Sequence, residues 1–200
     1  MGLRESKKLK TREQIAGEAM RLFVTRGFDH VTVAEVADAA GVSEKTVFNY
    51  FPTKEDLFFD EVPERQRSLV DAIRNREPGV TVVDALHRLQ NQQCGRLASP
   101  DFVLFARVIE NSQALKVKEL EMMSGFAQAI TESLTVEGID ERDARIAASL
   151  LIGVHRQLFR TARELALAGR HGPAAVRRLR ADGDRAFKLL ESGLSQLEPV

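Results

Sequence analysis

The sequence predicts an all-α protein, with a small N-terminal three-helix domain followed by a larger helical domain. Helix-capping signals recur along the whole chain, and between them apolar residues return every three or four positions. Strand signals are nearly absent, because β-branched residues do not alternate over any useful length. These observations together indicate about nine helices.

Three short helices are predicted in the first fifty residues. Capping boxes at Thr11–Gln14 and Thr32–Glu35 open the first two helices, and Ser43 caps the third. A glycine follows each of the first two helices and a proline follows the third, and both residue types end helices. The predicted ranges are 12–26, 33–40 and 44–50.

Longer helices are predicted for the rest of the chain. Thr53 caps a fourth helix, which Pro63 should kink or interrupt before the chain reaches Pro78 and Gly79. The change from short to long helices divides the chain into a domain at 1–52 and a domain at 53–200. The remaining helices are predicted at about 81–97, 100–113, 116–136, 141–168 and 173–197.

Composition argues against several classes of protein. An apolar content of 44% is ordinary for a globular protein, and a formal net charge of zero disfavours a protein that coats nucleic acid through bulk basicity. No stretch resembles a signal peptide or is long enough to span a bilayer, so we expect a cytoplasmic protein with no membrane partner.

Catalysis and metal binding are not expected. One cysteine, Cys94, and four scattered histidines provide no metal-ligand spacing, and no paired nucleophile and base is visible, so we expect no metal, no cofactor and no enzyme. Cys94 is most simply a small buried hydrophobe, and a redox role stays open.

The helices at 33–40 and 44–50 have the layout of a helix-turn-helix, over residues 32–51. Gly41 permits the turn, and Val47, Phe48 and Phe51 are expected to face the core. The first dozen residues are basic and form either a basic arm or a solubilising disordered tail. Spacing alone fits a DNA-binding module and a helical protein-interaction adaptor equally well.

The residues themselves are more specific than their spacing. The segments AGEAMRLFVTRGF, at 16–28, and VTVAEVADAAGVSEKTVFNYFPTKEDLF, at 31–58, closely resemble the tetracycline-repressor (TetR) family. The resemblance implies a homodimeric transcriptional regulator that binds double-stranded operator DNA, most often a repressor released by a small-molecule effector. A ligand-independent repressor and an activator remain alternatives.

The resemblance also implies roles for individual residues. Many family members carry tyrosine or histidine where this chain has Phe48 and Asn49; Asn49 is of interest because asparagine can read adenine. Phosphate contacts are implied for Thr32, Tyr50 and Lys54, and contacts in the major groove for Lys45, Thr46 and Asn49.

The second domain resembles the family only in its layout, which implies ligand sensing and dimerisation. An apolar stripe from Ala144 to Leu165 packs either within the chain or against a second copy. Core packing explains the central aromatic and methionine residues as well as a ligand pocket does. The candidate ligand-binding residues are Phe102, Phe105, Ile109, Met122, Phe126 and His155.

Overall fold

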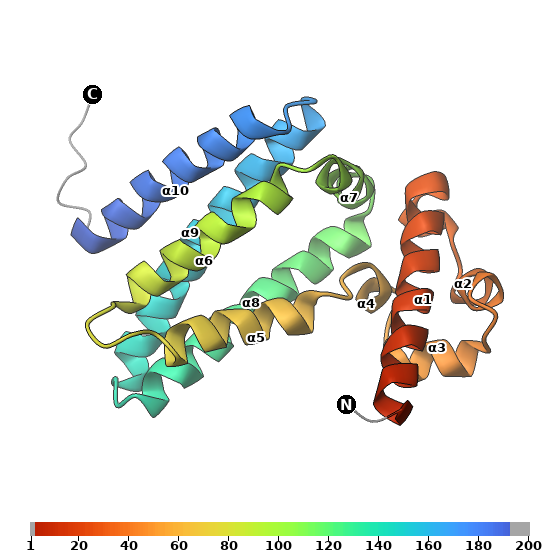
Figure 1. The fold of residues 1–200 in the computed structure, drawn as a ribbon, viewed down its shortest axis with the longest axis horizontal. Helices are drawn as coiled ribbons and strands as arrows, with labels where there is room; N and C mark the ends of the chain where they lie inside the picture. The colour runs from red at the N-terminus through yellow and green to blue at the C-terminus, as the bar shows by residue number, and fades with distance from the viewer. Residues whose placement is uncertain (1–2, 193–200) are drawn as a thin grey trace. The chain divides into compact units, whose positions relative to one another are not determined.

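The computed structural model describes residues 3–192, which form ten α-helices, one short 3-10 helix and no strand (Figure 1). This confirms the all-α prediction. The last helix was expected to reach residue 197, and its final residues lie outside the described part of the chain.

The chain divides into two compact units. The first contains Met1–Val62 and Arg107–Lys118, and the second contains Pro63–Ala106 and the chain from Glu119 onward. The functional boundary placed between residues 52 and 53 stays a prediction. By packing alone, the short helix that follows residue 53 lies with the first unit, because it contacts the first helix.

The first unit is built around its longest helix, α1, which packs against α2 and α4, while α2 packs against α3. Phe23, Phe28 and Phe58 meet in its core, with ring centroids 4.9 to 6.3 Å apart. The elements are α1 (Leu3–Arg26), η1 (Phe28–His30), α2 (Val33–Ala39), α3 (Glu44–Tyr50) and α4 (Lys54–Phe58).

The predicted start of the first helix is wrong. Helix α1 begins at Leu3, nine residues before the expected position 12, so the basic N-terminal segment is helical from Leu3 and is not a disordered tail. Leucine, arginine, glutamate and lysine are good helix formers, and no glycine or proline interrupts residues 3–11. Thr11 does not cap the helix, because its hydroxyl donates a hydrogen bond to the carbonyl of Lys7 within it.

The second unit is a bundle in which α6 packs against both α9 and α10 (Figure 1). Pro63 lies in the first turn of α5, a position that tolerates proline, and α4 has already ended at Phe58. The interruption predicted at Pro63 is therefore confirmed, and it raises the number of helices to ten. The helices that follow α4 are α5 (Val62–Arg74), α6 (Val82–Leu97), α7 (Pro100–Glu110), α8 (Gln113–Val136), α9 (Glu141–Leu167) and α10 (Pro173–Ser192), of which the end of α7 and the start of α8 belong to the first unit.

Helix α9 turns its stripe of small residues toward the interior of its own chain. Ala144, Ala148 and Leu158 are at most 1% exposed, so the stripe is intrachain core. Two ion pairs fix neighbouring segments of this unit: Arg76 donates two hydrogen bonds of 2.5 and 2.6 Å to Glu137, and Arg163 donates one of 2.9 Å to Glu119. Among the described helices, none combines the length and the apolarity that a membrane crossing requires.

Candidate DNA-binding surface and ligand pocket

The turn between α2 and α3 is held by backbone and side-chain hydrogen bonds. Gly41 has a φ of +65°, and after it the amide of Val42 donates to the carbonyl of Ala37 at 3.0 Å. From α1, Gln14 donates its side-chain amide to the carbonyl of Ala40 at 2.9 Å. These contacts fix the direction in which α3 leaves the turn.

A reciprocal cap closes the N-terminus of α2. The carboxylate of Glu35 accepts from the backbone amide of Thr32 at 2.8 Å and from its hydroxyl at 2.9 Å. Arg26 pairs with the same carboxylate at 2.8 Å. The backbone hydrogen bond from Thr32, and then the contact with Arg26, lower the pKa of Glu35 to about 2. The Thr32 hydroxyl therefore already donates within the cap, and its predicted phosphate contact requires it to turn away from Glu35.

Helix α3 separates an inner from an outer face. Val47 and Phe51 are at most 2% exposed, whereas Lys45 and Asn49 are exposed, as their predicted roles require. Phe48 was expected in the core, and this prediction is wrong, because 47% of the residue is exposed. In a helix of seven residues, Val47 and Phe51 already fill the inner face, and Phe48 is rotated about 100° from Val47.

The other three residues predicted to contact DNA differ in the contacts that their side chains already make within the protein. The hydroxyl of Thr46 is 2.8 Å from that of Ser43, which caps α3. The ammonium of Lys54 lies 4.2 Å from the centre of the Phe28 ring, and burial lowers the pKa of Lys54. Tyr50 is half-buried, and within residues 3–192 no hydrogen bond is found to its hydroxyl.

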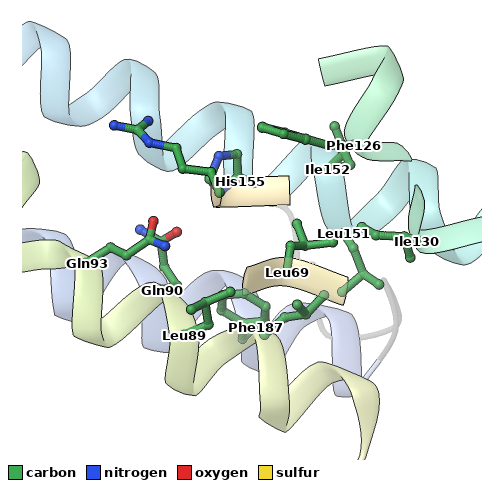
Figure 2. Close-up of a pocket in the computed structure, with 12 residues that line it drawn as sticks. Leu69, Leu89, Gln90, Gln93, Phe126, Ile130, Leu151, Ile152, His155 and Phe187 are labelled. Carbon is green, nitrogen blue, oxygen red and sulfur yellow. The ribbon is translucent and has the colours of Figure 1, made fainter. Parts of the chain in front are cut away.

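A small pocket opens inside the second unit; the centres of water-sized molecules can occupy about 40 Å³ of it, and its empty space is about 540 Å³ when the open solvent at its mouth is included. Figure 2 shows Gln90 and Gln93 together on one side, with Ile130 and Leu151 on the other. Helices α5, α6, α8, α9 and α10 all contribute side chains. The lining residues are Arg65, Leu69, Leu86, Leu89, Gln90, Gln93, Phe126, Ile130, Leu151, Ile152, His155 and Phe187.

His155 brings an imidazole to this largely apolar pocket. Its ring meets that of Phe126 edge to face, with centroids 6.3 Å apart. Burial lowers the pKa of His155 to about 4, and the positive charge of Arg65 adds to the effect. The imidazole is therefore neutral near pH 7 and offers one donor and one acceptor.

Comparison with known proteins gives three consistent matches. Residues 15–60 match the model of the bacterial regulatory proteins of the tetR family. The HTH-type transcriptional regulator TcmR of Streptomyces glaucescens is 25% identical over 171 residues, which cover 80% of this chain and 76% of TcmR. The regulator LuxR of Vibrio harveyi is 40% identical over 95 residues, covering 43% of this chain and 46% of LuxR.

A solved structure extends the likeness over nearly the whole chain. FadR of Thermus thermophilus, a TetR-family repressor in complex with lauroyl-CoA, is 25% identical, with a TM-score of 0.57. The match covers 94% of this chain and 97% of FadR. Residues 15–60 therefore carry a tetR-family domain, and the chain as a whole resembles TetR-family regulators.

These matches identify the protein as a DNA-binding transcriptional regulator. The matched residues 15–60 contain the whole helix-turn-helix, the short helix α4 and all six residues predicted to contact DNA. The comparisons favour this function over the helical adaptor.

The six candidate ligand residues do not form one site. Phe126 and His155 line the pocket, whereas Phe102 and Phe105 pack around Phe159 in a separate cluster. Ile109 is fully buried in the first unit. Met122 is half-buried and is not among the lining residues of the pocket.

The sequence reasoning missed Gln90 and Gln93. A signal for them existed, because both lie on the face of α6 that Leu86 and Leu97 define by their spacing, where apolar residues are the rule. Cys94, one residue further on, is fully buried, and burial raises the pKa of its thiol. In the described part of the chain, no cluster of histidine, cysteine and acidic residues is arranged to hold a metal ion.

Proposed function

We propose that this regulator is a homodimeric repressor that reads a two-fold symmetric operator with α3 and is released by a small apolar molecule. The observation that carries the proposal is the exposed row on α3. Lys45 and Asn49 point away from the core, and no hydrogen bond or ion pair to either side chain is found among residues 3–192. Both are free to meet base edges in the major groove.

Basic residues next to this helix supply affinity without sequence information. Lys7, Lys8 and Lys10 are exposed on the first turns of α1, and Lys45 adds a fourth charge from α3. Lysines that contact phosphates displace condensed counterions, so binding weakens as salt rises. We therefore expect the logarithm of the DNA affinity to fall linearly with the logarithm of the salt concentration.

Substitution of Asn49 tests whether α3 recognises the base sequence of the operator. We expect Asn49→Ala to lower affinity for the operator by about 1–3 kcal/mol while leaving affinity for random DNA nearly unchanged, because a bidentate contact to adenine is lost. Fluorescence anisotropy with both duplexes at one salt concentration measures the ratio. The matched control is Tyr50→Phe, which removes only the hydroxyl that is expected to contact phosphate. This variant should weaken both complexes equally. Equal losses for Asn49→Ala on the two duplexes would contradict its role as a reader.

Two observations support the proposal of repression and of release by an effector: a similar repressor of known structure and the pocket of the second unit. FadR of Thermus thermophilus is a repressor whose complex holds lauroyl-CoA, an apolar chain with a polar end. The pocket of the second unit is likewise mainly apolar, with a few polar side chains. Transcription from the regulated promoter, measured with the protein added to purified polymerase, distinguishes repression from activation.

The dimer requires a face other than the small-residue stripe of α9. The small-residue stripe of α9 is buried within the chain, whereas Ile146 and Leu150 remain 61% and 53% exposed, four residues apart on the opposite side of the helix. Gly153, next along this side, allows a second helix to approach closely. We propose that this face forms the dimer and sets the separation of the two α3 helices.

A further inference from the structure

The pocket contains three polar side chains that no protein group satisfies. Gln90 is 5% exposed, and among residues 3–192 no hydrogen bond is found to its side-chain amide, to that of Gln93 or to the imidazole of His155. All three line the same cavity, and Figure 2 shows the two glutamines on α6 side by side, with His155 presented from α9.

Polar groups in such places usually have partners. A buried amide without a hydrogen bond destabilises the folded state, and native proteins contain few of them. Gln90 is buried and Gln93 and His155 are half-buried, and all three line the cavity, so the partners that can reach their polar atoms come from outside the chain. Water can supply these partners in the ligand-free protein, and the polar end of a bound molecule can replace it.

The charges around the cavity select the kind of polar end. The twelve lining residues include one guanidinium, that of Arg65, and no carboxylate. A cationic end would meet a like charge and would be buried without a counter-ion, which is strongly unfavourable. An oxygen that is negative or partly negative instead accepts from the amides of Gln90 and Gln93 and from the neutral imidazole.

The opposite end of the cavity fits an apolar body. Away from the two glutamines, Ile130 of α8 and Leu151 of α9 supply aliphatic walls, and Leu69 of α5 lies between them and the glutamines. Phe126 of α8 adds an aromatic wall beside His155. We propose that the pocket binds an apolar molecule whose one polar end is either a neutral carbonyl group or an anionic carboxylate, held by Gln90, Gln93 and His155. The pocket excludes molecules with a cationic end. Its role as an effector site rests on the function proposed above, whereas the class of ligand does not.

A matched set of three compounds tests the proposal. The probes are 4-phenylbutanoate, 4-phenylbutanamide and 4-phenylbutylamine, which share one apolar body and differ only in the polar end. Isothermal titration calorimetry with the full chain at pH 7.5 should show binding of the acid and the amide, with the amine at least about tenfold weaker.

Two glutamine variants locate the site on α6. Gln90→Leu keeps the volume and should weaken the acid and the amide by about tenfold, because it removes the donor to the oxygen. The control is Gln92→Leu, since Gln92 is exposed on the same helix and does not line the pocket. It should leave all affinities unchanged. Thermal unfolding of both variants verifies that they fold.

Three results would overturn the proposal: an amine that binds as tightly as the acid, equal affinities in the two glutamine variants, or no binding of any probe at about 1 mM. Failure of the proposed function gives a different result. If a probe binds but the affinity for DNA selected from a random pool does not change, release by effector is contradicted while the class of ligand stands.

Discussion

Phe48 presents an aromatic ring to solvent from the middle of the helix that we place in the major groove. Its exposed fraction of 47% is unusual for phenylalanine in a chain without a partner. The ring cannot donate or accept a conventional hydrogen bond, but it can contact the C5-methyl group of thymine.

We expect Phe48→Ala to reduce affinity for operators with thymine at the contacted step by about 1 kcal/mol, the scale of one buried methyl contact. Replacing that thymine by uracil removes only the methyl group, so it should weaken binding of the wild-type protein and leave Phe48→Ala unaffected. Anisotropy titrations of the four combinations measure the coupling. If uracil weakens both proteins equally, Phe48 does not read the methyl group.

His155 should make stability depend on pH. Its pKa is about 4 in the folded protein and about 6.5 in the unfolded chain, so the unfolded state takes up the proton first as pH falls. The free energy of unfolding should therefore decrease between pH 6.5 and 4, by about 2 kcal/mol at pH 5.0 relative to pH 7.5. Urea denaturation at both pH values, at one protein concentration, measures this change.

The control for this prediction is His155→Gln, which keeps a polar side chain that does not titrate and should flatten the difference. Glu35 does not interfere, because its pKa of about 2 affects stability only below its ordinary value of 4.5. An unchanged pH dependence in His155→Gln would show that another group is responsible.

The sequence predicted which side chains are buried where the spacing of apolar residues defined one inner helix face, and it failed where an apolar residue could lie on either of two adjacent faces. Val47 and Phe51 were expected inside and are buried, because both are apolar and lie four residues apart. Phe48 has the same chemistry, and only the packing around a seven-residue helix decides its position. Gln90 and Gln93 were missed for the opposite reason, since a polar residue on an inner face becomes informative only when the cavity beside it is known.

At the scale of elements, capping signals predicted most helix boundaries. The boxes at Thr32, Thr53 and Thr81 are all formed. The box at Thr11 is a false signal, because the helix-forming residues before it extend α1 to Leu3. A capping pattern marks a boundary only where the preceding residues cannot continue the helix.

Helix α9 carries the prediction on assembly. Leu150→Arg places a charge in the centre of the proposed dimer face without touching the core, since Leu150 is 53% exposed. We expect the variant to be a folded monomer at about micromolar concentration, with operator affinity reduced by at least tenfold, because two-fold sites need both heads. Light scattering and circular dichroism measure mass and folding.

The matched control for this variant is Leu120→Arg, since Leu120 is 58% exposed on α8 and lies outside the proposed face. It should remain a dimer with unchanged operator affinity. A dimeric Leu150→Arg protein would place the interface elsewhere.

At the scale of the whole molecule, the chain passes between the two units at three places. The first passage lies at Val62 and Pro63, and the other two lie within α7 and within α8. None of the three was predicted as a boundary from the sequence, which placed the boundary at 52/53 and indicated at Pro63 only a kink or interruption of a helix. That a later turn belongs to the first unit depends on long-range contacts that no local pattern encodes.

Helix α8 belongs to both units, and its start is tied to the first one. Lys118 pairs with Asp56 of α4 at 3.0 Å, and the buried Ser112, just before α8, donates a hydrogen bond of 2.7 Å to Asp29. Eight residues beyond Lys118, the same helix brings Phe126 to the pocket. An uninterrupted helix is a rigid element, so a shift of α8 caused by a ligand at Phe126 should reach these two contacts.

This connection leads to a prediction about coupling. A ligand that moves α8 should lower the affinity for operator DNA, because the two heads must stay about 34–36 Å apart, or a multiple of that, to enter successive major grooves. Thermodynamic reciprocity requires that operator DNA lower the affinity for the ligand by the same factor. With a ligand identified by thermal shift, calorimetry on the free protein and on the operator complex measures that factor.

Two variants assign the coupling to a route. Lys118→Ala removes the ion pair with Asp56, whose lysine side chain is 24% exposed, and should reduce the coupling factor toward one while both single affinities persist. Pro63→Ala tests the alternative, a pivot at the junction of α4 and α5, and should leave the factor unchanged if α8 is the route, since a proline in the first turn of a helix interrupts no internal hydrogen bond. If Pro63→Ala abolishes the coupling and Lys118→Ala preserves it, the pivot carries the signal. Equal ligand affinity of the wild-type protein on and off DNA would reject release by effector altogether, because without differential binding no ligand can shift the population of DNA-competent dimers.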